Sequence, residues 1–248
     1  MEKTTRPVVI ITGASRGLGR AMALKFGRSG FRVAVNYLQQ TEAVRETVQE
    51  ILQSGGEAAP FQADIRNFQE VERLVSEVHR SWGTADVLIH NAGITVDSLL
   101  PATRDDDWNR VLDTHLKGAF NLLRTHVRAM MDRGHGHIIH IGSRVGLIGR
   151  AGQSAYAAAK AGLVGLTLSA ARELGPSGVQ VNLVLPGFLP TGIQESLSDR
   201  AREEILRAHF LSSPPEINEV VDFIYALSRM KGVSGQVFNL DSRPVITL

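Results

Sequence analysis

The chain has 248 residues and no cysteine, which excludes disulfide bonds, thiolate metal ligands and a cysteine nucleophile. A formal net charge of +2 gives no reason to expect nucleic-acid binding, although basic patches remain available to an acidic protein partner. The polar N-terminus and the short apolar run at 8–11 indicate neither a signal peptide nor a membrane span, so we expect a cytoplasmic protein without membrane contact.

Apolar runs that suit buried strands alternate with amphipathic runs that suit helices. Strands are predicted at 8–12, 32–37, 58–62, 86–90, 137–142, 179–185 and 236–240, and most are continuously apolar, as strands covered on both faces are. Helices are predicted at 18–29, 42–54, 69–82, 105–131, 154–174 and 216–230. This alternation predicts an α/β fold: a single domain over 1–248 of Rossmann type, with a doubly wound parallel sheet of about seven strands and helices on both faces. Residues 187–215 lack a clear period, and we interpret them as a lid-like substrate loop.

The sequence Thr-Gly-Ala-Ser-Arg-Gly-Leu-Gly at 12–19 follows the first predicted strand directly. Glycines at such a turn let the backbone approach a pyrophosphate, and the next helix offers free N–H groups and its positive dipole end. A merely tight turn is the alternative, but the strand–turn–helix setting favours a dinucleotide site.

The second predicted strand ends at Val35-Asn36-Tyr37, where NAD-binding folds usually place a carboxylate for the ribose 2′-hydroxyl. No carboxylate stands there to repel a 2′-phosphate, and the guanidinium of Arg16 is available to pair with one. We therefore expect NADP(H) rather than NAD(H), with Arg16 as an ordinary solvated charge as the alternative.

Ser143, Tyr156 and Lys160 form the candidate catalytic set. Ser143 follows the fifth strand at the sheet edge where open α/β sheets bind ligands, and Tyr156 and Lys160 are spaced i, i+4 on one helix face. A neighbouring ammonium lowers the pKa of a tyrosine, so we expect Lys160 to make Tyr156 a better acid–base group. Taken alone, Tyr156 and Lys160 would equally suit the surface of an alanine-rich helix.

These residues carry a family resemblance. The glycine turn, Asn91-Ala92-Gly93, Ser143, Tyr156-Ala157-Ala158-Ala159-Lys160 and Pro186-Gly187 together resemble the short-chain dehydrogenase/reductase family along essentially the whole chain. Within it, the segments at 129–131, 152–156 and 186–188 are most similar to the 3-oxoacyl-(acyl-carrier-protein) reductases of fatty acid synthesis.

The resemblance implies NADPH-dependent reduction of a 3-oxoacyl thioester, linked to acyl carrier protein or CoA, to its 3-hydroxyacyl form. It implies that Tyr156 protonates the substrate oxygen, Lys160 holds the nicotinamide ribose and Ser143 binds the substrate carbonyl. It also implies cofactor contacts from Gly13, Ser15, Arg16, Gly17, Leu18, Asn36, Asp64, Ile65, Asn91, Ala92, Gly93, Tyr156, Lys160, Pro186, Gly187 and Thr191.

Three positions depart from the family pattern. His115 stands where the family has a catalytic asparagine, and we expect it to join the proton relay and add an ionisation near about pH 6.5. Residues 212–215 and 240–243 lack the family's usual elements after the lid and after the last strand. The alternatives are a catalytically weak NADP-binding paralogue or subunit, and a reductase of a different ketone or alcohol such as a polyketide intermediate.

The resemblance also implies a homotetramer packed through the helices at 105–131 and 154–174. It links Arg128 and Arg172 to docking of an acidic acyl carrier protein beside the active-site mouth, to which Arg133 could add. His137 and His140 fall on opposite faces of one predicted strand and cannot share a metal ion, so no metal site is expected.

Overall fold

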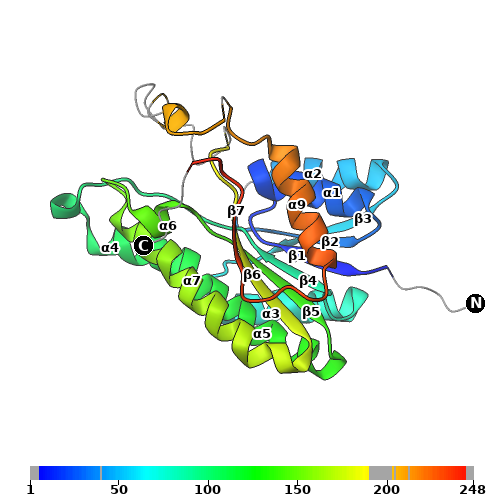
Figure 1. The fold of residues 1–248 in the computed structure, drawn as a ribbon. Coiled ribbons are helices and arrows are strands. Elements are labelled where there is room, and N and C mark those ends of the chain that lie inside the picture. The colour runs from blue at the N-terminus through cyan, green and yellow to red at the C-terminus, as the bar shows by residue number, and fades with distance from the viewer. Residues whose placement is uncertain (1–5, 40, 190–202, 204, 212, 244–248) are drawn as a thin grey trace, which may run out of the picture.

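The computed structural model describes residues 6–39, 41–189, 203, 205–211 and 213–243. Its centre is a seven-stranded sheet in the order β3-β2-β1-β4-β5-β6-β7, with every neighbouring pair parallel (Figure 1). The strands are β1 (Val8–Ile11), β2 (Arg32–Tyr37), β3 (Glu57–Gln62), β4 (Val87–His90), β5 (Gly136–Ile141), β6 (Val179–Leu185) and β7 (Val237–Asn239). The predicted doubly wound parallel sheet is confirmed.

Helices cover both faces of the sheet. They are α1 (Gly17–Arg28), α2 (Thr41–Gln53), α3 (Phe68–Trp82), α4 (Asp105–Leu112), α5 (Gly118–Arg133), the short α6 (Val145–Ile148), α7 (Ser154–Leu174) and α9 (Ile217–Arg229). Single 3-10 turns occupy η1 (Leu100–Ala102) and η3 (Gly175–Ser177). Apolar side chains of α1, α2 and α9 pack on one face, and those of α3, α5 and α7 on the other. No helix in the described part of the chain has the length and apolarity to cross a membrane.

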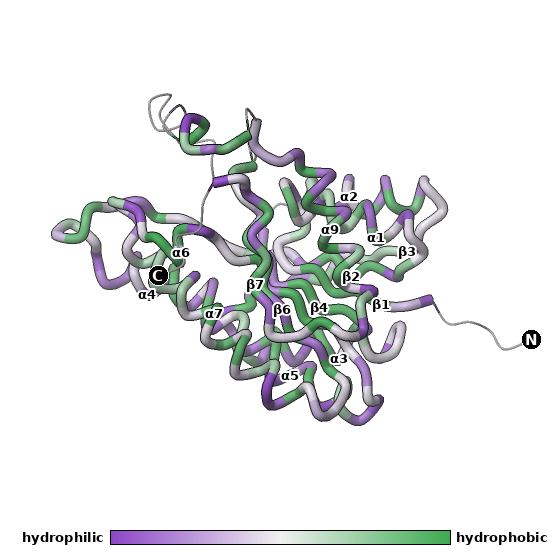
Figure 2. The backbone as a smooth tube through the Cα atoms, viewed as in Figure 1, coloured by the Kyte–Doolittle hydropathy of each residue, from purple (hydrophilic) through white to green (hydrophobic). Residues whose placement is uncertain are grey.

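Burial on both faces explains the continuous apolar runs of the central strands. All four residues of β1 are buried, with Val9 and Ile11 in one core cluster and Val8 and Ile10 in the other. Figure 2 shows the strands of the sheet as mainly hydrophobic tube inside a more hydrophilic periphery. Burial of apolar side chains on both faces therefore stabilises the central strands. Because the strands are parallel, their carboxyl ends lie together at one edge of the sheet.

The predicted helix over 105–131 is helical throughout and ends at Arg133, but it is not one regular α-helix. The helical segment contains a π-helical turn, η2 (Asp113–Lys117), between α4 and α5. A π turn holds one extra residue, and here Thr114 and His115 are buried. Apolar residues keep a helix-like spacing across the π turn, so the sequence pattern does not reveal the extra residue.

Two smaller differences concern a strand and the lid. β5 begins and ends one residue earlier than the predicted 137–142. The lid expected at 187–215 falls largely outside the described residues. Within it, the His209 imidazole lies 2.9 Å from the hydroxyl of Ser242, which also accepts the Leu211 N–H at 3.3 Å.

Candidate active site

The glycine turn between β1 and α1 forms a cradle in which certain positions can be occupied only by glycine. Gly13 and Gly17 have φ angles of 62° and 54°, which disfavour residues with a Cβ. A Cβ on Gly13 would lie 2.8 Å from the Cα of Ala92, and one on Gly19 would lie 2.2 Å from the Gly13 carbonyl oxygen. The first turn of α1 therefore reaches the sheet edge with its backbone N–H groups free for an anion, which fits a pyrophosphate.

Asn91 and Thr12 hold this cradle in place. The Asn91 amide donates to the carbonyl oxygens of Thr12 and Gly13 at 2.9 and 3.1 Å. The Thr12 hydroxyl accepts the backbone N–H groups of Asn91 and Ala92, each at 3.0 Å. These bonds tie the end of β4 to the glycine turn, so Asn91 has a structural role beside the predicted ribose contact.

Arg16 and Asn36 occupy different environments. Arg16 is exposed, and its side chain makes no hydrogen bond or ion pair with the described residues, so its guanidinium is available. The Asn36 side chain is buried and its amide already donates to the carbonyl oxygens of Phe61 and Ala63. Asn36 therefore shapes the wall of the site, and Arg16 presents an exposed positive charge beside it.

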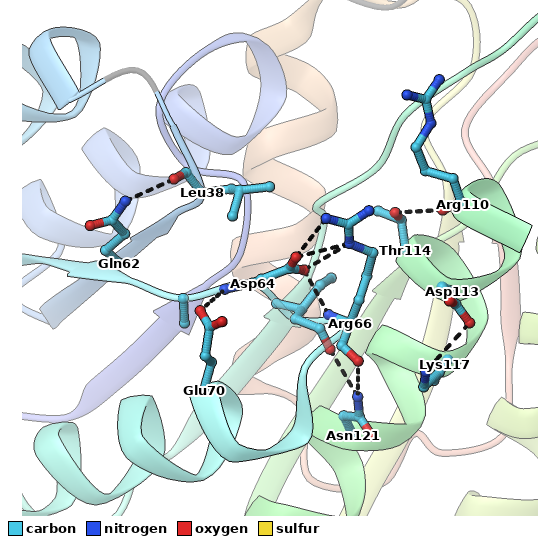
Figure 3. A network of polar contacts seen from close by, with 12 residues as sticks. Leu38, Gln62, Asp64, Arg66, Glu70, Arg110, Asp113, Thr114, Lys117 and Asn121 are labelled. Atoms are coloured by element: carbon cyan, nitrogen blue, oxygen red, sulfur yellow. Dashed lines mark hydrogen bonds and ion pairs between the residues drawn. The ribbon is translucent and has the colours of Figure 1, made fainter. Parts of the chain in front are cut away.

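Asp64 and Arg66 lie at the adenosine end of the cleft, within the polar network of Figure 3. The Arg66 Nε lies 2.9 and 3.0 Å from the two carboxylate oxygens of Asp64. Burial alone would raise the pKa of Asp64, but the hydrogen bonds from Arg66 outweigh it and lower the pKa. The Asn121 amide donates to the carbonyl oxygens of Ile65 and Arg66, so α5 fixes the loop after β3.

A cleft of about 680 Å³ joins these parts along the carboxyl edge of the sheet. It contains sixteen of the predicted site residues, namely Gly13, Ser15, Arg16, Gly17, Leu18, Asn36, Asp64, Ile65, Asn91, Ala92, Gly93, His115, Tyr156, Lys160, Pro186 and Gly187. Ser143 lies outside this lining, and Thr191 lies outside the described residues. Sequence reasoning missed Arg66 and Arg110, which also line the cleft and are cations after β3 and on α4.

Tyr156 lines the far end of the cleft, and Ser143 hydrogen-bonds to it from just outside the lining. The Ser143 Oγ accepts the backbone N–H of Val145 at 3.2 Å, which fixes the serine at the start of α6. Burial raises the pKa of Tyr156 to about 12, although the hydrogen bond with Ser143 lowers it. Desolvation of the phenolate dominates in the structure, so the expected lowering of this pKa by Lys160 is not found. Tyr156 therefore holds its proton at neutral pH, as a proton donor must.

Lys160 is buried beneath the tyrosine. Its side chain is 4% exposed, and its ammonium donates to the Ile141 carbonyl oxygen at 2.7 Å. The Nζ atom lies 5.5 Å from the centroid of the Tyr156 ring. Burial lowers the pKa of Lys160 to about 7, so the amine titrates near neutrality.

His115 packs between the cleft wall and Tyr156. Its Nε2 lies 2.7 Å from the carbonyl oxygen and 3.1 Å from the nitrogen of Ile94, and its ring meets that of Tyr156 edge to face at 5.1 Å. A Cβ on Gly93 would lie 2.3 Å from the imidazole, so the glycine makes room for it. Burial holds the pKa of His115 well below 6.5, and nearby Lys160 lowers it further. The expected ionisation near pH 6.5 is therefore contradicted.

The site residues match a known family. Residues 7–202 match the family model described as short chain dehydrogenase. The chain belongs to the short-chain dehydrogenase family. As a member, it is an oxidoreductase that acts on a ketone or alcohol with a nicotinamide cofactor.

Curated members of the short-chain dehydrogenase family align with nearly the whole chain. The 3-oxoacyl-[acyl-carrier-protein] reductase FabG of Staphylococcus aureus is 39% identical over 235 residues, covering 94% of this chain and 95% of that protein. The 3-oxoacyl-[acyl-carrier-protein] reductase of Synechocystis sp. is 37% identical over 246 residues, covering 99% and 100%. The crystal structure of levodione reductase superposes with a TM-score of 0.90 at 27% identity, covering 95% of this chain and 96% of that one. The family resemblance read from the sequence is confirmed.

The predicted docking arginines do not lie beside the mouth of this cleft. Helices return antiparallel to the strands, and sixteen residues of α7 separate Tyr156 from Arg172, or about 24 Å of helix. Arg128 lies toward the corresponding end of α5, where it pairs with Asp132 at 3.2 Å. Arg133 is committed to the carbonyl oxygens of Thr84 and Ala85. Within one chain, these cations therefore cannot flank the active site.

The histidines of β5 do not converge on one ion. His137 hydrogen-bonds Asn182 at 3.0 Å, whereas the His140 ring contacts that of His90 on the neighbouring strand. In the part of the chain that the structure describes, no group of three or more histidine or carboxylate side chains is placed to hold a metal.

Proposed function

We propose that the protein reduces a 3-oxoacyl thioester, carried by acyl carrier protein or CoA, to the 3-hydroxyacyl form with NADPH. The observation that carries the proposal is the placement of Tyr156, Ser143 and Lys160 at the end of a glycine-cradled cleft. The relatives at 37–39% identity are 3-oxoacyl-[acyl-carrier-protein] reductases, which supports the same substrate class.

The cofactor, when bound, supplies a hydride to the carbonyl carbon. Tyr156 then breaks its O–H bond and gives the proton to the carbonyl oxygen, which becomes the product hydroxyl. The high pKa of Tyr156 keeps this proton in place until negative charge develops on the substrate oxygen. Ser143 orients the carbonyl and stabilises the oxygen as charge builds. The ammonium of Lys160 stabilises the phenolate that remains and replaces its proton.

The cofactor preference follows from charge at the adenosine end. Arg16 is exposed and unengaged, and Arg66 lies in the same cleft, although Asp64 already binds its guanidinium. A 2′-phosphate on the ribose gains a charge-assisted contact with Arg16 that a 2′-hydroxyl cannot match. This supports NADPH over NADH.

Docking of the acyl carrier requires a second copy of the chain. In the proposed homotetramer, α5 and α7 pack against the same helices of another copy. An antiparallel arrangement would bring Arg128 and Arg172 of one copy toward the cleft of the other. Both side chains are exposed and carry the positive charge that an acidic carrier protein needs.

One observation favours a second candidate, the reduction of a different ketone. The buried carboxylate of Asp241 binds Arg243 and lies 3.4 Å from the His209 imidazole, next to Gly187 in the cleft wall. This polar cluster stands at the substrate end of the cleft. A catalytically weak paralogue is the remaining alternative, since His115 fills the position of the family's asparagine.

The deciding experiment measures NADPH oxidation with acetoacetyl-CoA, an acetoacetyl carrier protein and simple ketones. We expect turnover with the thioesters, and we expect Tyr156→Phe to lower kcat at least 1000-fold while NADPH binding by fluorescence stays within threefold. Turnover of the ketones alone would favour the second candidate. No turnover of any substrate by the natural chain, or near-normal turnover by Tyr156→Phe, would overturn the proposal.

A further inference from the structure

Two buried histidines lie behind Lys160, and the proposed chemistry does not use them. His90 ends β4 and His140 is the next-to-last residue of β5, and the two are register partners on adjacent parallel strands. Both are 0% exposed, and their ring centroids are 5.5 Å apart in an edge-to-face arrangement. They lie two residues after Leu88 and Ile138 and so on the same strand face, which packs in the core under α3, α5 and α7, the layer that carries Lys160.

The ring nitrogens of these histidines are unsatisfied. Within the described residues, no hydrogen bond of normal geometry reaches either nitrogen of His90 or His140, or the Nδ1 of His115; the His90 ring has only a polar contact with the Thr114 backbone. Buried polar atoms are nearly always paired, so five such atoms in one place indicate a common partner. On the opposite face of β5, the Nδ1 of His137 also lacks a partner, but its Nε2 is bound to Asn182.

Lys160 is the one cation that all three imidazoles share. Burial lowers the pKa of His90, His115 and His140, and the charge of Lys160 lowers each further. The ammonium donates to the carbonyl oxygen of Ile141, the residue that follows His140. No carboxylate in the described part of the chain forms an ion pair with it, although a buried charge normally requires a partner.

We propose that His90 and His140 are positioning residues that solvate the buried Lys160 ammonium in place of a carboxylate. Their neutral ring nitrogens accept its remaining N–H groups through a buried water molecule. A neutral acceptor stabilises the ammonium without neutralising it, so the full positive charge stays available to Tyr156. This deepens the proposed function, because it rests on the role given there to Lys160.

The first test measures the titration of Lys160 in the cofactor-free protein. Carbon-13 NMR of the lysine Cε signals gives the pKa, and Lys160→Met assigns the signal by removing it. We expect His140→Leu and His90→Leu each to lower the pKa of Lys160 by at least one unit, a tenfold change in acid dissociation. His140→Gln should restore most of it, because the amide oxygen can accept the same N–H.

His137→Leu is the matched control, since it removes a buried imidazole from the other face of the same strand. It should leave the titration of Lys160 unchanged. Unchanged titration in both His90→Leu and His140→Leu would overturn the proposal, and so would an equal shift in His137→Leu.

A second measurement needs no histidine variant to fold. Nitrogen-15 spectra of the histidine rings should change for His90 and His140 in Lys160→Met and stay constant for His137. Constant shifts of all three rings would contradict the proposal.

Enzyme kinetics distinguish a failure of this proposal from a failure of the proposed function. The groups that face Lys160 are His90 from β4, His140 from β5, His115 from η2 and Tyr156 from α7. In His140→Leu, the alkaline limb of the kcat profile should move to lower pH, with KM for the ketone within threefold. If the natural chain reduces no ketone, the proposed function fails, and the NMR titration still decides the role of the histidines. If the chain is active and His140→Leu keeps both its profile and its Lys160 titration, the histidine role alone fails.

Discussion

Lys160→Met should stabilise the protein at neutral pH, which is unusual for loss of a catalytic residue. An unfolded lysine keeps its proton to about pH 10.5, whereas burial lowers the pKa of Lys160 to about 7. Between these values the unfolded chain binds more protons than the folded one, so stability rises with pH across this window. The full difference corresponds to about 4 to 5 kcal/mol, at about 1.36 kcal/mol per unit.

Part of this gain is lost in the variant. Lys160→Met leaves the Ile141 carbonyl oxygen, which now accepts at 2.7 Å, without its partner. An unpaired buried carbonyl costs about 1 to 3 kcal/mol, so the net gain at pH 7 should be about 2 to 3 kcal/mol. For a chain of this length, that raises Tm by roughly 5 to 10 °C.

The assay is urea unfolding at pH 7 and pH 9.5, with protein concentration fixed because assembly also stabilises. Relative to Lys160→Met, the natural chain should gain about 3 kcal/mol over this interval, because most of its buried ammonium is discharged. The exposed Lys231→Met is the control and should follow the natural chain. If the natural chain and Lys160→Met give parallel curves, Lys160 is not a buried titrating ammonium and the reasoning is refuted.

Three further outcomes follow from the site. Arg16→Ala should weaken NADPH binding at least tenfold, about 1.4 kcal/mol, and NADH binding less than twofold by fluorescence titration; equal losses would exclude a 2′-phosphate contact. His115→Asn should change kcat but not the shape of the pH–rate profile between pH 5.5 and 7.5, since burial holds the pKa of His115 well below 6.5; an ionisation that disappears in the variant would contradict this. Gly19→Ala should weaken NADPH binding at least tenfold because its Cβ would meet Gly13 and Asn91, whereas Gly165→Ala, with nothing within 4 Å, should bind normally.

The architecture and the cofactor cradle could be predicted because their signals are local. A strand buried on both faces must be continuously apolar, as β1 is, and a backbone that passes a pyrophosphate needs glycine where Gly13 and Gly19 stand. The spacing of Tyr156 and Lys160 likewise fixes their common helix face wherever the helix packs.

Properties that depend on packing could not be predicted. The sequence contains Tyr156 and Lys160 four residues apart, which favours a low tyrosine pKa, but their burial reverses the shift. The π turn adds one residue without interrupting the apolar period, so the burial of His115 was not foreseen. The distance of Arg172 from the cleft of its own chain could not be predicted. A family resemblance assigns a role to a residue but does not say whether the residue acts at the site of its own chain or at that of another copy.

The two halves of the cleft differ in how closely they follow the family. The cofactor half keeps the family pattern: the glycines form the cradle, Asn91 holds the cradle in place, and Lys160 is buried beneath Tyr156. At the substrate half, the segment at 240–243 departs from the family pattern, and within it Asp241 brings a buried carboxylate within 3.4 Å of His209. Because hydride transfer depends on the first half and substrate choice on the second, the reaction class can be inherited while the ketone or alcohol substrate differs. The substrate range of the chain must therefore be measured across both thioesters and free ketones, since the relatives' names bear mainly on the shared half.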